Sequence, residues 1–114
     1  MRAIRLHAPG QIEDLRLDEI QLPEPHPEHV LVRVHAAAIT RDELEWPTDR
    51  LPAIPSYELS GVVAEDAGEM LAGTEVFGLT PFDRDGVAAD YALVPMEVLA
   101  PKPPSVSHVQ AAAL

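Results

Sequence analysis

Every second position of residues 30–34 is valine, with leucine and arginine between the valines. Because successive side chains of a strand point to opposite faces, this period of two predicts a β-strand with one buried face. His35 falls on the face opposite the valines, where we expect it to be exposed to solvent. This run is the clearest strand signal in the chain.

Three shorter apolar runs also have the length of strands, at residues 61–65, 75–79 and 89–94. Asp85 and Gly86 stand between two of these runs, and an Asp-Gly pair favours a hairpin turn because glycine adopts positive φ without steric cost. Many short strands with regular turn signals are typical of a small barrel or sandwich. The pattern therefore predicts a mainly β fold with short helices.

One further strand is predicted near the N-terminus, with an irregularity. Leu15 and Leu17 alternate, but Ile20 and Leu22 continue the apolar pattern out of phase. A slip of one residue moves side chains to the other face of a strand, and a β-bulge produces such a slip. We therefore expect a bulge at Asp18 or Glu19.

The first of two predicted helices begins at Thr40. Thr40 and Glu43 have the spacing of a capping box, in which each side chain satisfies a free backbone N–H of the other residue. Asp42 adds negative charge at the positive end of the helix dipole, and Pro47 ends the helix after Trp46. This predicts a helix of barely two turns.

Ser107 and Gln110 form a second capping box, followed by three alanines, which favour helix strongly. The chain ends at Leu114, only a few residues later. Helices shorter than about 12 residues are marginal unless they pack on other structure. The abrupt end indicates that the helix, and the protein, are truncated at this point.

Composition limits the classes of function. The chain has 114 residues, enough for one domain, and its 19 acidic residues against 8 basic ones give a net charge of −11. Such a charge repels nucleic acid and anionic membranes. There is no cysteine and no apolar run long enough for a signal peptide or membrane helix. We expect a cytoplasmic protein with no nucleic-acid or membrane partner.

Five segments together carry a family resemblance: VLVRVHAAAITRDEL, LPAIPSYELSGVV, TEVFGL, DGVAADYALVP and LAPKPPSVSHVQAAAL. Their order and spacing over residues 1–114 resemble the N-terminal half of the medium-chain dehydrogenase/reductase superfamily. The resemblance implies a GroES-like, partly open β-barrel, followed in the intact enzyme by a Rossmann domain that binds NADP(H). The active site would lie in the cleft between the two domains.

Two differences from the zinc-dependent branch of that family narrow the resemblance. Thr40 stands where zinc alcohol dehydrogenases have a cysteine, and Tyr57 stands where they have the histidine before a glutamate, here Glu58. Neither a hydroxyl nor a phenol is a useful zinc ligand at neutral pH. The resemblance therefore implies a zinc-free, quinone oxidoreductase-like enzyme, with no metal site, that reduces quinones, enones or related carbonyl substrates.

The same resemblance implies roles for individual residues. The cofactor would deliver hydride while Tyr57 and Thr40, as the catalytic hydrogen-bond donors, polarise a carbonyl. Thr40 and Arg41 would contact the cofactor. Asp42 and Glu43 would lie at the cleft mouth, and the indole of Trp46 would form an apolar wall. Four residues would thus bind substrate: Asp42, Glu43, Trp46 and Glu58.

Each of these residues also has a structural interpretation. Thr40 is explained as a helix cap, and Tyr57 can pack at the edge of the barrel. Glu58 can pair with an arginine or be solvated, and Trp46 can belong to the core. Asp42 and Glu43 can be first-turn charges. The five histidines show no spacing typical of metal ligands.

The sequence contains no G-x-G-x-x-G motif, so we do not expect this chain to bind a dinucleotide tightly or turn over by itself. An alternative function is therefore a standalone GroES-like binding or scaffold module without turnover. A co-chaperonin would need a mobile polar loop, whereas this region holds the compact LPAIPSYEL turn. The uncovered apolar face of the barrel predicts a homodimer or higher oligomer.

Overall fold

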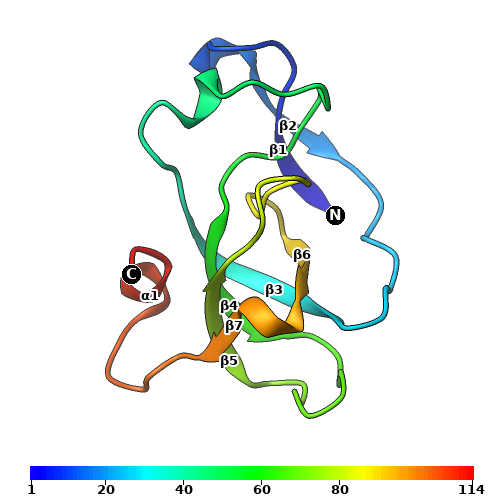
Figure 1. Cartoon of the computed structure of the whole chain (residues 1–114), viewed down its shortest axis with the longest axis vertical. Coiled ribbons are helices and arrows are strands. Elements are labelled where there is room, and N and C mark those ends of the chain that lie inside the picture. The colour runs from blue at the N-terminus through cyan, green and yellow to red at the C-terminus, as the bar shows by residue number, and fades with distance from the viewer.

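The computed structural model describes residues 1–114 and is mainly β (Figure 1). The strands are β1 (Arg2–Leu6), β2 (Leu15–Glu19), β3 (His29–Ala38), β4 (Glu58–Val63), β5 (Glu75–Leu79), β6 (Tyr91–Pro95) and β7 (Leu99–Pro101). Single-turn 3-10 helices lie at Ile12–Asp14, Glu43–Glu45 and Met96–Val98, and the only α-helix is α1 (His108–Ala112). No helix is long and apolar enough to cross a membrane.

The strands form two antiparallel sheets that do not close on each other. One sheet has the order β6-β3-β4-β5-β7, and the other is the pair β1-β2. Isolated bridges from Ala3 to Ala89 and from Leu6 to Ala53 tie the small sheet to the loops of the large one. This arrangement confirms the predicted partly open β-barrel. The short strands β1 and β7 had no clear signal in the sequence.

The hydrophobic core is built mainly on the central strands of the large sheet. Val30 and Val32 of β3 are fully buried, so the predicted alternation is confirmed, and β3 continues to Ala38. Leu59 and Val76 from β4 and β5 pack in the same cluster. Pairing of these strands brings their apolar side chains together on one face. Burial of that face stabilises the large sheet.

The boundaries of two strands differ from the predicted ones, and the bulge lies elsewhere. β4 begins at Glu58 and β6 at Tyr91, while β5 has the predicted bounds. The prediction of a bulge at position 18 or 19 is wrong, because β2 pairs with β1 in unbroken register to its end. Leu17 is 64% exposed, so its alternation with Leu15 does not mark a buried face. The register shift is in β3, between Val34 and Ala36.

The predicted hairpin at Asp85 and Gly86 is also wrong. β5 and β6, which flank this pair, are not neighbours in the sheet, and Gly86 does not have a positive φ. Instead the loop crosses the segment before β4: the Gly86 N–H donates to the Ile54 carbonyl (2.7 Å) and Asp85 Oδ1 accepts from the Ile54 N–H (3.0 Å). A Cβ on Gly86 would overlap the carbonyl oxygens of Pro55 and Ser56. Glycine is required here by close approach of two backbones.

The two predicted helices have different outcomes. α1 begins with the predicted capping box between Ser107 and Gln110. The helix predicted from Thr40 is only the 3-10 turn Glu43–Glu45, and its N-cap is Asp42 at φ 61° without a side-chain cap. Half of the capping box is present, because Glu43 accepts from the Thr40 N–H (3.0 Å). Thr40 uses its own hydroxyl elsewhere, so the turn is not extended.

Candidate functional site

The loop that follows β3 is held to the start of β4 by a buried carboxylate. Glu43 is only 6% exposed, and its two oxygens accept from the backbone N–H groups of Thr40 and Ser56. The chain therefore leaves β3, turns through Glu43–Glu45 and returns to β4 around one side chain. Glu43, which was expected to face the cleft mouth, is a buried side chain that positions this loop.

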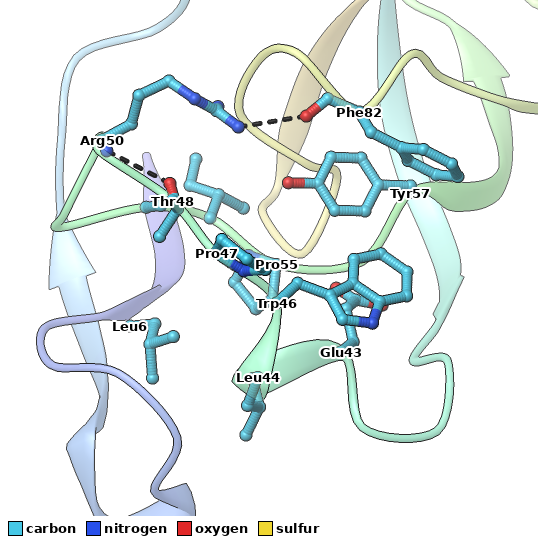
Figure 2. Close-up of a pocket in the computed structure, with 12 residues that line it drawn as sticks. Leu6, Glu43, Leu44, Trp46, Pro47, Thr48, Arg50, Pro55, Tyr57 and Phe82 are labelled. Atoms are coloured by element: carbon cyan, nitrogen blue, oxygen red, sulfur yellow. Dashed lines mark hydrogen bonds between the residues drawn. The ribbon is translucent and has the colours of Figure 1, made fainter.

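This loop borders a cavity of about 120 Å³ that is partly open to solvent and has an aromatic wall (Figure 2). The rings of Trp46, Tyr57 and Phe82 form a triangle, in which the centroid of Tyr57 is 6.2 Å from that of Trp46 and 5.1 Å from that of Phe82. Trp46 and Phe82 meet edge to face at 5.6 Å. We call this space, bounded by Trp46, Tyr57, Phe82 and Arg50, the aromatic cavity. Its walls suit a flat ligand because aromatic rings pack on planar groups.

Arg50 supplies the charged group of the aromatic cavity. Its Nη2 donates to the Phe82 carbonyl (3.1 Å), and its backbone N–H donates to Thr48 Oγ1 (3.1 Å). Nη1 is buried and has no hydrogen-bond partner in the chain. The hydroxyl of Tyr57 forms no hydrogen bond with the residues drawn in Figure 2, where it points to the same side of the cavity as the guanidinium. The Tyr57 hydroxyl is therefore available to donate to a ligand, whereas Arg50 Nη1 is an unsatisfied donor that is closed to solvent in this conformation.

The remaining predicted site residues lie outside the aromatic cavity. Thr40 Oγ1 donates to Glu58 Oε1 (3.3 Å), so Glu58 contacts a hydroxyl and not an arginine. The side chain of Arg41 is 95% exposed and lies 3.8 Å from the carboxylate of Asp42. The structure thus divides the predicted residues into Tyr57, Trp46 and Glu43 at the cavity and the others beside it.

Arg50 and Phe82 are among the cavity residues that the sequence analysis missed. Arg50 is one of 8 basic residues in the chain, and Phe82 is one of two phenylalanines. Neither belongs to a periodic pattern or a motif. Their only signal is position, because each stands beside a proline-rich turn that brings distant loops together.

A second polar cluster lies where α1 packs on β3, β4 and β5. His108 contacts the buried Ser60 through Nδ1 (2.7 Å) and Glu75 Oε2 through Nε2 (2.9 Å). Lys102, with 5% of its side chain exposed, lies 3.6 Å from the same Glu75 oxygen, and His35 stacks on His108. We call these five residues the α1 cluster. His35 is exposed, as predicted, but its ring contacts α1.

The α1 cluster groups a serine, a histidine and a glutamate that no sequence motif connects. Ser60 is fully buried and also donates to the Val76 carbonyl (3.1 Å), so its hydroxyl is not placed for attack on a substrate. Burial, together with the nearby His35, lowers the pKa of His108 below its ordinary value of 6.5, although Glu75 opposes this. These contacts hold α1 on the sheet.

No three histidine, aspartate or glutamate side chains of the chain lie together in a way that could hold a metal ion. Among the positions where the family resemblance would place zinc ligands, the Glu58 carboxylate and the Thr40 hydroxyl lie in contact with each other. One carboxylate and one hydroxyl are a poor donor set for zinc, which prefers thiolate, imidazole and carboxylate ligands.

Comparison with known proteins agrees with this architecture. The chain is 28% identical to a zinc-type alcohol dehydrogenase-like protein of Schizosaccharomyces pombe, covering 100% of this chain and 37% of that protein. It is 28% identical to the NADPH-dependent alkenal/one oxidoreductase of Arabidopsis thaliana, covering 92% and 32%. The quinone oxidoreductase structure from Coxiella burnetii superimposes with a TM-score of 0.90 at 26% identity, covering 100% and 40%.

The chain spans about two fifths or less of these relatives. Residues 26–104, which include β3 to β7 and the aromatic wall, match the alcohol dehydrogenase GroES-like domain. The chain therefore belongs to the alcohol dehydrogenase GroES-like domain family, in the medium-chain dehydrogenase/reductase superfamily, and is similar to its quinone oxidoreductase-like branch.

Proposed function

We propose that this chain is the substrate-binding half of a zinc-independent, NADP(H)-dependent oxidoreductase that reduces quinones, enones or related carbonyls. The aromatic cavity carries this proposal, because its flat wall and free Tyr57 hydroxyl suit an unsaturated carbonyl compound. Relatives named as quinone and alkenal/one oxidoreductases support the same substrate class.

In this proposal Tyr57 donates a hydrogen bond to the carbonyl oxygen and stabilises the negative charge that develops on it. Trp46 forms the wall against which the substrate lies. Thr40 is the second donor: its hydroxyl is 3.3 Å from Glu58, so a reorientation would be needed to reach a substrate. The nicotinamide group, when bound, supplies the hydride.

The cofactor contacts assigned to this chain are Thr40 and Arg41. Arg41 extends into solvent beside Thr40, which suits an anionic group of a dinucleotide. Asp42 and Glu58 would contact substrate at the edge of the site, and Glu43 would act by holding the loop that carries Trp46. A C-terminal Rossmann domain in the intact protein would supply most of the cofactor site.

Zinc independence is supported by the side chains of this chain. It has no cysteine, and the two positions that resemble the zinc ligands hold Thr40 and Tyr57. A cytoplasmic location, favoured by the absence of cysteine, is part of the same proposal. So is a homodimer or higher oligomer, supported by Val109 in α1 and Leu114 after it, each 73% exposed.

The proposal can be tested with 2-cyclohexen-1-one as a small enone probe. Trp46 is the only tryptophan, so its single indole N–H signal in an NMR spectrum reports on the aromatic cavity. We expect the enone to shift this signal and Tyr57→Phe to weaken binding about tenfold, the size of one lost hydrogen bond. Tyr91→Phe, at the only other tyrosine, is the matched control.

An unchanged indole signal at saturating enone, or equal affinities of the Tyr57→Phe and Tyr91→Phe variants, would contradict the proposed role. Binding without any NADPH oxidation by a longer chain that includes a nucleotide-binding domain would favour the alternative function, a GroES-like binding module without turnover. The absence of a G-x-G-x-x-G motif from these 114 residues is the observation behind that alternative.

A further inference from the structure

The aromatic cavity has more unpartnered hydrogen-bond donors than unpartnered acceptors. Arg50 Nη1 has no partner, and the Tyr57 hydroxyl has none among the lining residues. The one carboxylate that lines the cavity, Glu43, already accepts from two backbone N–H groups. A ligand that satisfies this cavity must therefore supply acceptor oxygens.

Arg50 also forms no ion pair, although the chain is rich in carboxylates. The chain has 19 acidic residues, yet none forms an ion pair with Arg50. Its guanidinium is held at one edge by the Phe82 carbonyl, and its backbone N–H is held by Thr48. Nη1 has no partner within the chain to displace, and because it is closed to solvent here, a ligand oxygen reaches it when the side chains around it move apart. A guanidinium held in this way is suited to a carboxylate, which it can bind through two parallel hydrogen bonds.

The size of the cavity limits the rest of the ligand. Its volume is about 120 Å³, close to the roughly 150 Å³ cavity that is known to hold benzene. The rings of Trp46, Tyr57 and Phe82 form its wall. One flat ring or a conjugated chain of similar size fits this space, whereas a free phosphate would gain nothing from the aromatic wall.

We propose that Arg50 is a specificity-determining residue that binds a carboxylate, so that the substrate is a flat, unsaturated carbonyl compound carrying an acidic group. This inference rests on the proposed function, because it names the substrate class of the same site. Tyr57 donates a hydrogen bond to the reacting carbonyl, and Arg50 binds the acidic group. The anionic substrate would be held by a local positive group despite the net charge of −11.

Benzoate and benzamide form a matched pair of probes, since they share a ring and differ in charge. Binding to the 114-residue chain is followed by the Trp46 indole N–H signal. We expect benzoate to bind about tenfold more tightly than benzamide, the size of a hydrogen-bonded charge interaction. Arg50→Gln should abolish this preference, and Arg50→Lys, which keeps the charge but not the fork, should retain part of it. Arg16→Gln, at an exposed position, is the control for lost charge.

Equal binding of benzoate and benzamide to the unmodified chain would overturn the inference, whether or not the Arg50 variants fold. So would an unchanged preference in folded Arg50→Gln, or inorganic phosphate that displaces benzoate at equal concentration. Enone binding without benzoate preference would leave the proposed function intact, whereas benzoate preference without enone binding would leave only the anion site.

Discussion

The aromatic cavity and the α1 cluster use polar groups in opposite ways. In the α1 cluster the buried polar side chains have partners within the chain, because Lys102 and His108 share one oxygen of Glu75 and Ser60 contacts His108. In the aromatic cavity Arg50 Nη1 has none. Satisfied buried groups stabilise and fix a structure, whereas unsatisfied donors cost stability and are retained where a ligand completes them. The difference separates a structural junction from a candidate site.

The two regions also differ in construction. The α1 cluster lies on regular strands and a capped helix, while the aromatic cavity is lined mostly by residues outside the strands. Loops can vary without loss of the core, which is why binding residues gather on them. The cavity therefore depends on the few contacts that hold those loops, among them the two backbone hydrogen bonds accepted by the buried Glu43.

The largest expected effect comes from breaking the support of the cavity. Glu43→Ala removes the acceptor for two backbone N–H groups, so we expect a loss of about 3 kcal/mol in the free energy of unfolding, measured by urea denaturation. Glu45→Ala, at an exposed position in the same turn, is the matched control and should change it by less than about 0.5 kcal/mol. Equal losses in the two variants would show that the Glu43 contacts contribute little.

The sequence predicted the regular part of this molecule better than the site. The valines of β3 and the capping box of α1 are local patterns, and both were confirmed. The hairpin at Asp85 and Gly86 failed because the constraint on Gly86 is contact with a distant backbone, which no local pattern records. The roles of Glu43 and Arg50 are likewise set by loops that meet only in three dimensions.

A smaller effect is expected from the pH dependence of the α1 cluster. The pKa of His108 is lowered by burial and by His35, so the unfolded chain binds more protons than the folded one below pH 6.5. Stability should therefore fall as the pH drops from 6.5 through the lower folded-state pKa, by less than about 1.4 kcal/mol per pH unit. Urea denaturation across this window measures the slope.

His108→Gln should reduce that slope, because it removes the titrating group while keeping a polar side chain. The matched control is His26→Gln, at an exposed position away from α1. A slope that is the same in His108→Gln and the unmodified chain would assign the pH dependence to other groups. The aromatic cavity should keep its Trp46 indole signal throughout, since the α1 cluster lies outside it.

Phe82→Ala should change stability least among these variants. It tests directly whether the aromatic wall serves ligand binding or the fold. Phe82 is 56% exposed, so Phe82→Ala should change the free energy of unfolding by less than about 0.5 kcal/mol. Its ring nevertheless lies 5.1 Å from Tyr57 and forms part of the aromatic wall, so enone affinity should fall by about fivefold, the cost of one lost aromatic contact. Phe77→Leu, on β5 away from the cavity, should leave affinity unchanged. A loss of stability equal to the loss of binding would mean that Phe82 belongs to the fold, like the residues of the α1 cluster, and that the cavity wall is not reserved for a ligand.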